Sequence, residues 1–553
     1  MQPNIPQWKY ERDFNFKEGI SSIEGTRYDL NVNENQDLVL LNDKQINHFL
    51  ANGYLQLDTQ LPFDYHQSMF DKFKEIIGED NDFNPGNNLL PVVPEINLVF
   101  DDPIIKGALL SVLGENYMMH PHRVLHDNPP RSDPQVWHHD SYWGYKRKVH
   151  NHHPWWVMIM YYPQDTYKEI GPTGIIPGSQ YIAQRLEDKD ISEIYVDGKA
   201  GVCMMIHYDI WHRKMKNFTE LKRFMVKFEF IRMQQPKGIT WDNESPDSIN
   251  EFELNSVNYH PIWKSQLEWI SGKKIKSFRF NQKSLVNDNG NGLNHNLKSN
   301  DKKVISEALN NLFCQRKLTN YTIDLIESLV MHEDEYISLS ACYSLAYQGV
   351  GGIKKLINLM HSNDGDNVDD ARCFIDEGQK SELEMICRNA AHGLVSCNIN
   401  CIDELLKAYD DGQNRLKKYA CFILGEISSN SEKVLDTLRS GCIEEDPAIR
   451  LNAVEALGLK KCRDKEILVI ESLLRDKDDE VRFNAALALA RNGKRSKSAT
   501  NSLAKSLTDP NRYVYGYALE ALDRIESKKS NAYLKKHLKI TRYCPYTSTN
   551  SLF

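Results

Sequence analysis

The centre of the chain reads Trp211-His212-Arg213-Lys214-Met215-Lys216-Asn217-Phe218-Thr219-Glu220-Leu221-Lys222-Arg223, and about seventy residues earlier it reads Trp137-His138-His139-Asp140. In an extended segment alternate side chains share a face, so His138 and Asp140 point the same way and His139 points to the other side. The apolar run 201–206 just before Trp211 predicts a buried strand that ends in a turn carrying His212. The fold can therefore bring these three polar side chains together.

Two imidazoles and one carboxylate can occupy one face of an octahedron and leave the opposite face open, which is the ligand set of non-heme iron sites that react with oxygen. We therefore predict that His138, Asp140 and His212 bind iron. His207 is the alternative third ligand, but it lies inside the predicted strand and is better interpreted as a pocket or core histidine. An isolated His-x-Asp pair is a weak pattern, and a histidine-rich loop would also contain one.

Arg223 opens a second predicted strand, 223–230, eleven residues after His212. Its guanidinium can hold a carboxylate through two parallel hydrogen bonds, as binding of a dicarboxylate would require. Three adjacent cations, Lys146, Arg147 and Lys148, follow the histidine motif; they fit either a solvated loop or a contact for an anionic substrate group.

The segment from about 36 to 240 resembles the phytanoyl-CoA dioxygenase family of Fe(II)- and 2-oxoglutarate-dependent oxygenases. Near Leu41 and Asn52-Gly53-Tyr54 the chain resembles that family's opening helix and strand. The chain departs from the family at Lys214, where many members carry Ser or Thr. The matching residues are His138, Asp140, Gly171-Pro172, Pro177-Gly178-Ser179, Trp211-His212, Asn217 and Arg223.

The resemblance implies Fe(II) as the metal, 2-oxoglutarate and O2 as cosubstrates, and ascorbate as a candidate reductant. It implies that Arg223 binds the distal carboxylate of 2-oxoglutarate and that Tyr161 lies beside this cosubstrate. Halogenating relatives replace the carboxylate ligand with a small residue. Because Asp140 is present, hydroxylation of an unactivated C–H bond is favoured over halogenation.

The second half of the chain is repetitive. An alanine followed four residues later by a leucine recurs, and the last four intervals are 30, 33, 32 and 33 residues. A two-helix unit of this length cannot bury its apolar face alone, so stacked units form a solenoid. The pairs are Ala341/Leu345, Ala390/Leu394, Ala420/Leu424, Ala453/Leu457, Ala485/Leu489 and Ala518/Leu522.

Residues 303–541 resemble short HEAT repeats of the phycobilisome lyase type, with an acidic insert at 363–370. Such repeats offer a concave surface for a protein partner; a stabilising appendage or a dimerisation arm is the alternative. Deoxyhypusine hydroxylase is a HEAT-repeat enzyme that binds iron through repeated His-Glu pairs. Here His332-Glu333 is the only such pair, so we expect the iron in the N-terminal half.

Composition limits the classes of partner. The formal net charge of −8 gives no electrostatic footprint for nucleic acid. The sequence shows no secretory signal and no apolar run of about eighteen residues that would span a membrane. Eleven cysteines without C-x-x-C spacing, ten of them beyond residue 300, are typical of free buried thiols in a reducing compartment. We therefore expect a cytoplasmic protein.

The sequence thus predicts a multidomain chain: an all-β double-stranded β-helix core (jelly-roll or cupin-like) with flanking helices, joined to an all-α HEAT-like solenoid. The expected function is oxidation of a small-molecule substrate. A protein hydroxylase whose solenoid recruits the substrate, or a non-catalytic scaffold, is the alternative. The predicted boundaries are an extension at 1–35, the dioxygenase domain at 36–280, an Asn-rich linker at 281–302, the solenoid at 303–541 and a tail at 542–553.

Overall fold

The computed structural model describes residues 37–78, 84–140, 149–183, 192–243, 259–272, 291–313, 315, 318–361 and 382–540. The predicted N-terminal extension, the C-terminal tail, the acidic insert and the cations 146–148 lie outside these ranges, as does the first part of the predicted linker. Within the described ranges no helix is long and apolar enough to cross a membrane.

The first half of the chain forms two antiparallel sheets. The larger has five strands in the order β1-β6-β3-β8-β2, and the smaller has three in the order β5-β4-β7. The five-stranded sheet contains β1 (Tyr54–Asp58), β2 (Met118–Asn128), β3 (Trp156–Tyr161), β6 (Val202–His207) and β8 (Arg223–Ile231). The three-stranded sheet contains β4 (Thr173–Ile175), β5 (Ile194–Tyr195) and β7 (His212–Lys214).

Helices accompany these sheets before, between and after the strands. Asn42 begins α2 with a reciprocal capping box to Gln45, which satisfies two backbone donors that the first turn leaves free. These helices are α2 (Asp43–Asn52), α3 (Phe63–Ile77), η1 (Gly86–Asn88), α4 (Leu89–Val92), η2 (Pro94–Ile96), α5 (Asn97–Asp101), α6 (Pro103–Leu113), η3 (Lys168–Ile170), η4 (Ser179–Tyr181) and α8 (His260–Ser271).

The second half is helical, as the repeat pattern predicts. Its elements are α9 (Asn291–Asn296), α10 (Lys302–Leu312), α11 (Asn320–Ser328), η7 (Leu329–Met331), α12 (Glu335–Ala346), α13 (Val350–Leu359), α14 (Glu382–Ser396), η9 (Asn398–Cys401), α15 (Ile402–Asp411), α16 (Asn414–Glu426), α17 (Glu432–Gly441), α18 (Pro447–Gly458), α19 (Asp464–Leu473), α20 (Asp479–Asn492), η10 (Gly493–Ala499), α21 (Thr500–Ser506), α22 (Arg512–Ile525) and α23 (Lys528–Ile540). Helix α9 lies inside the predicted linker, and Leu297 just after it joins the buried core of the repeats.

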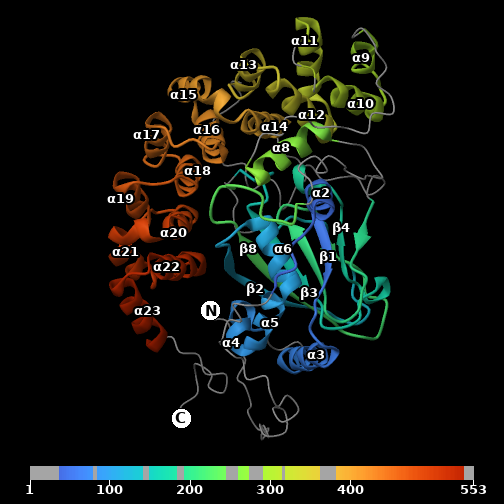
Figure 1. The fold of residues 1–553 in the computed structure, drawn as a ribbon, viewed down its shortest axis with the longest axis vertical. Helices are drawn as coiled ribbons and strands as arrows, with labels where there is room; N and C mark the ends of the chain where they lie inside the picture. The colour runs from blue at the N-terminus through green and yellow to red at the C-terminus, as the bar shows by residue number, and fades with distance from the viewer. Residues whose placement is uncertain are drawn as a thin grey trace, which may run out of the picture.

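The predicted alanine–leucine pairs lie on the even-numbered helices α12 to α22, and all their members are fully buried. In Figure 1 the repeat helices form an arc from α10 to α23 around one side of the sheets, with the even-numbered helices on the inner side. Every residue of α18 from Ala448 to Gly458 is buried. A helix buried on all sides must be covered by something other than its own repeat.

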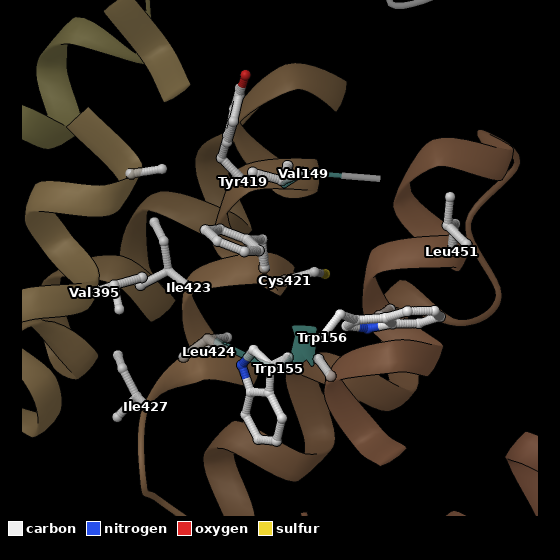
Figure 2. Packing of buried hydrophobic residues seen from close by; sticks show 14 of the residues in the cluster. Val149, Trp155, Trp156, Val395, Tyr419, Cys421, Ile423, Leu424, Ile427 and Leu451 are labelled. Carbon is white, nitrogen blue, oxygen red and sulfur yellow. The ribbon is translucent and has the colours of Figure 1, made fainter. Parts of the chain in front are cut away.

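Neighbouring repeats cover α18 in part, and the five-stranded sheet with the segment before β3 shares the same buried core. Strand β8 is buried along its whole length, and its alternate residues join two different cores. Phe224, Val226, Phe228 and Phe230 face the core shared with the N-terminal helices. Met225 and Ile231 face the other way, into a core that continues into the repeat helices. Figure 2 shows Trp155 and Trp156 at the start of β3 among repeat residues such as Tyr419 and Cys421.

Buried polar contacts fix this interface. Glu426 at the end of α16 accepts hydrogen bonds from Trp155 Nε1 at 2.9 and 3.0 Å and contacts His153 Nδ1 at 2.5 Å. Arg388 of α14 donates to the carbonyl oxygen of Tyr181 at 2.8 Å and to Glu335 at 2.6 Å. A buried carboxylate or guanidinium is tolerated only when it is paired and hydrogen-bonded, so these contacts specify one docking geometry.

At the far end of the arc, α22 packs on a bulge in the edge strand β2. The register of β2 against β8 shifts between Met119 and Arg123, and Pro121 lies within this bulge. A Cβ on Gly516 of α22 would approach the Pro121 ring to 2.5 Å, which is closer than real Cβ contacts allow. The glycine therefore permits the helix to approach the sheet.

We predict that Gly516→Ala lowers the free energy of unfolding, by about 1–3 kcal/mol for an overpacked contact. The matched control is Gly351→Ala in α13, where a Cβ would meet nothing within 4 Å. There the substitution should stabilise the protein by up to about 1 kcal/mol, because alanine is the better helix former. Chemical denaturation of both variants measures the difference; equal stabilities would contradict the close approach of α22.

Candidate metal centre

The structure brings His138 and Asp140 together with His212, which lies on a distant part of the chain. His212 begins β7, and its backbone exchanges two hydrogen bonds of 3.1 Å with His138 in an isolated antiparallel bridge. The two rings are 4.5 Å apart between centroids. Asp140 follows His138 by two residues in the sequence. One ligand atom from each of the three residues lies within 4.8 Å of the others. The predicted face of two imidazoles and one carboxylate is present.

Both imidazoles are oriented by their own backbone. Nδ1 of His138 lies 3.0 Å from the carbonyl oxygen of Val136, and Nδ1 of His212 lies 3.0 Å from that of Ile210. A proton on each Nδ1 donates to that carbonyl and leaves Nε2 as the lone-pair donor toward the centre, the usual outer-shell arrangement of metal-binding histidines. Burial and the neighbouring His212 lower the pKa of His138 to about 4, which keeps its ring neutral.

Lys227 of β8 is a member of this site that the sequence analysis did not single out. Its Nζ donates to Asp140 Oδ2 at 2.6 Å. Burial alone would raise the pKa of Asp140, but Lys227 and His212 outweigh it and hold that pKa well below its usual range. A lysine four residues after Arg223, between the apolar residues Val226 and Phe228, is the signal that could have drawn attention to it.

Arg223 is fully buried on the same face of β8 as Lys227. Its Nε and Nη2 donate to the carbonyl oxygen of Gly171 at 3.2 and 3.0 Å, while Nη1 has no hydrogen-bond partner among the described residues. The Tyr162 ring lies 5.6 Å from the guanidinium carbon. A buried guanidinium with an unused donor is suited to an anionic ligand, because leaving such a group unpaired is unfavourable.

The structure explains why glycine at 171 and asparagine at 217 are needed near Arg223. Gly171 has φ +69°, and a Cβ there would meet Asn128 at 2.3 Å and the Met215 carbonyl at 2.7 Å. Asn217 is buried and donates to the carbonyls of Asn128, Pro129 and Leu221, which ties the loop before β8 to the end of β2. These two residues hold the backbone against which Arg223 is placed.

Ser179 of the Pro-Gly-Ser motif supports the segment that leads to His212. Its Oγ donates to the Ile176 carbonyl at 2.6 Å and accepts from the backbone N–H of Trp211 at 3.0 Å. It therefore fixes the residue that precedes the candidate ligand His212. Ser179 therefore supports the backbone next to His212 and is not itself one of the three grouped side chains.

Tyr161 does not lie beside Arg223. It pairs with Val226 on the opposite face of the sheet, and its hydroxyl contacts His66 Nδ1 at 2.8 Å within the core shared with the N-terminal helices. The ring of Tyr162 lies on the Arg223 side instead, because neighbouring residues of an extended segment point to opposite faces. His207 is also outside the metal face: its Nδ1 accepts from the Asp209 N–H.

Two family models match separate segments of the chain. Residues 60–225 match the family model for phytanoyl-CoA dioxygenase (PhyH), and residues 467–543 match that for HEAT repeats. Both predicted resemblances are thereby confirmed. Comparison with curated proteins found no match.

Several solved structures resemble part of the chain. The 2-oxoglutarate-dependent carbocyclase SnoK from nogalamycin biosynthesis is 17% identical, with 35% of this chain and 85% of that chain covered and a TM-score of 0.29. HygX from Streptomyces hygroscopicus, solved with nickel and 2-oxoglutarate, is 16% identical over 37% and 93%, also with a TM-score of 0.29. AviO1 from Streptomyces viridochromogenes is 15% identical over 34% and 93%, with the same score.

We predict that His212→Ala weakens Co(II) binding at least about 100-fold, because losing even an outer-shell partner of a ligand costs about 10- to 100-fold. His207→Ala is the control, since that histidine is buried nearby without facing the metal. Equilibrium dialysis with metal analysis, on variants whose melting is checked first, gives the affinities. Loss of binding in His207→Ala with retention in His212→Ala would reverse the ligand assignment.

Proposed function

We propose that the chain is an Fe(II)- and 2-oxoglutarate-dependent dioxygenase that hydroxylates an unactivated C–H bond of a small molecule. The observation that carries the proposal is the joint geometry of the metal face and Arg223. His138, Asp140 and His212 offer three ligands within 4.8 Å of one another, and Arg223 offers a buried, unused donor on the adjacent sheet. A scaffold without catalysis would have no physical need for this combination.

The two sheets are proposed to form the walls of a double-stranded β-helix. The smaller sheet supplies His212 from β7, and the larger supplies Arg223 and Lys227 from β8. Sites built on strands hold their side chains more precisely than sites on free loops. This arrangement would explain why the ligands come from distant parts of the chain.

Fe(II), 2-oxoglutarate and O2 together would supply the oxidising chemistry for C–H cleavage. Within this proposal His138, Asp140 and His212 hold the metal, and Arg223 binds the distal carboxylate of the cosubstrate through charge-assisted hydrogen bonds. Tyr162 and Gly171 keep the guanidinium in place. Asp140 fills the position that would need to be vacant for a halide, which favours hydroxylation.

A small-molecule substrate is favoured over a protein recruited by the repeats. The inner side of the solenoid shares a continuous buried core with the five-stranded sheet, so the surface that would hold a partner chain is already covered along α14 to α22. Recruitment through the outer helices stays an alternative. The eight described cysteines are free and buried, which supports a cytoplasmic location.

We predict that anaerobic addition of Fe(II) and then 2-oxoglutarate produces a weak visible metal-to-ligand band, and that admission of air yields succinate. Arg223→Gln should raise the dissociation constant of 2-oxoglutarate by about 10- to 100-fold, because a hydrogen bond to a charged group contributes about 1.5–3 kcal/mol.

The matched control is Arg232→Gln, just beyond the other end of β8. Arg232 is also buried and also donates to a carbonyl, that of Val112 at 2.9 Å. If both variants bind 2-oxoglutarate as the wild type does, Arg223 is not the carboxylate anchor. If metal-loaded wild type gives neither band nor succinate, the scaffold alternative holds.

A further inference from the structure

The last repeat of the solenoid has a charge opposite to that of the rest of the chain. Residues 493–540 contain eleven lysines and arginines but only four aspartates and glutamates, a formal net charge of +7. The whole chain carries −8, so the remaining residues carry −15. The segment comprises η10, α21, α22 and α23, and Figure 1 shows these last three helices together at one end of the arc. The positive charge is therefore concentrated at one end of the solenoid.

The acidic residues of this segment do not neutralise it. Three of the four already have partners, in the ion pairs Asp509–Arg482, Glu520–Arg524 and Glu526–Lys494. On the outer helices that precede the segment the cations are matched, since Arg463 and Lys465 both bind Glu432. This pairing of charges does not continue to the end of the solenoid.

The lysines of α23 form one exposed side of that helix. Lys528, Lys535 and Lys539 are spaced by seven and four residues, and Lys529 and Lys536 by seven, so they form two adjacent rows. All five are exposed, and none makes an ion pair with another residue in the described ranges. Five like charges held on one side of a helix repel one another until an anionic partner binds.

The neighbouring elements extend this charge. Arg495 and Lys497 of η10 and Lys505 of α21 are exposed, and they too lack an ion pair among the described residues. Helix α21 lies beside α23, because the Tyr533 hydroxyl donates to Asn501 at 3.1 Å. These three cations and the five lysines of α23 are called the terminal basic surface.

Two apolar side chains accompany the lysines. Leu538 is 65% exposed and Ile540 is 73% exposed, and the helical period places them on the two flanks of the lysine rows. The remaining side of α23 faces the repeat, where Nε2 of His537 lies 2.8 Å from the Tyr515 hydroxyl. A helix with a basic face and exposed aliphatic residues beside it is suited to the interface between lipid headgroups and acyl chains.

The composition of the terminal basic surface favours lipid over nucleic acid. Only one of its eight cations is an arginine, the residue that binds phosphate through two parallel hydrogen bonds, whereas lysine acts as a point charge. Among the described residues 493–540 no aromatic side chain is exposed on which a base could stack. Leu538 and Ile540 would also stay in water on a nucleic acid.

We propose that the terminal basic surface docks the protein on a membrane surface that contains anionic lipids, with Leu538 and Ile540 entering between the headgroups. The negative potential of such a surface attracts lysines within a screening length. The remaining residues are net negative and are repelled, so the last repeat is directed toward the lipid. This inference does not depend on the proposed oxygenase function.

The test is co-sedimentation of the full-length chain with vesicles. One set contains phosphatidylcholine alone, and the other contains phosphatidylcholine and phosphatidylserine in equal parts. We expect binding to the second set only, and loss of that binding when the salt is raised from about 0.1 M to about 1 M, because the screening length falls from about 10 Å to about 3 Å.

A charge-matched pair of double variants locates the contact. Lys535→Glu with Lys536→Glu should weaken binding at least about 30-fold, because each lysine near an anionic surface contributes about fivefold. Lys407→Glu with Lys433→Glu changes the net charge equally at exposed positions of α15 and α17, and it should have a much smaller effect. Thermal melting checks that all variants are folded.

A pair of uncharged substitutions tests the apolar contribution. Leu538→Asn should weaken binding about tenfold, because burial of a leucine side chain contributes at least about that factor. Leu468→Asn, on the 59% exposed leucine of α19, should leave binding unchanged. Equal binding of these two variants would contradict insertion into lipid.

Binding of the wild type to neither vesicle set, or equally to both, would overturn the proposal. So would equal binding of the two double variants. A wild type that ignores the vesicles but binds a DNA duplex, and loses that binding in Lys535→Glu with Lys536→Glu, would assign the surface to nucleic acid instead.

Discussion

The burial of β8 on both faces is the constraint on which the rest of the structure depends. One face is covered by helices of the N-terminal half, and the other continues into the core of the repeats. The second face also carries Arg223, Lys227 and Glu229, three charges that cannot stay buried without fixed partners. Arg223 is paired with the Gly171 carbonyl and Lys227 with Asp140. Glu229 lies beside His120 and His122 of β2. The fold therefore requires β8 to be buried on both faces, and burial in turn requires a fixed partner for each of its charged side chains.

The repeats have an unexpected place in this arrangement. A solenoid usually offers its concave side to another molecule. Here that side is occupied by the chain's own sheets, through Glu426, Arg388 and the helix that carries Gly516. The repeats thereby cover the segment before β3 and the edge strand β2.

The sequence was sufficient for the features with a local signal. The alternation of His138 and Asp140, the strand that ends before His212 and the spacing of the repeat alanines each follow from a regular period. The position of Tyr161 was inferred from the resemblance alone, and a shift of one residue in a strand moves a side chain to the other face.

The contacts between distant segments left no such signal. Nothing in the sequence places Tyr513 beside His122, which is 391 residues away. The pairing of Lys227 with Asp140 depends on how two sheets are placed relative to each other. Helix α9 was missed because its six residues are rich in asparagine and contain a single leucine. Residues whose role depends on the tertiary fold lie beyond what composition and periodicity can indicate.

The most direct test of the account is anomalous scattering at the iron edge from crystals grown without oxygen in the presence of Fe(II) and 2-oxoglutarate. The account predicts one strong peak within coordination distance of His138 Nε2, His212 Nε2 and an Asp140 oxygen, with the distal carboxylate of 2-oxoglutarate on Arg223. A peak at another set of residues, or none in crystals of metal-loaded protein, would contradict it.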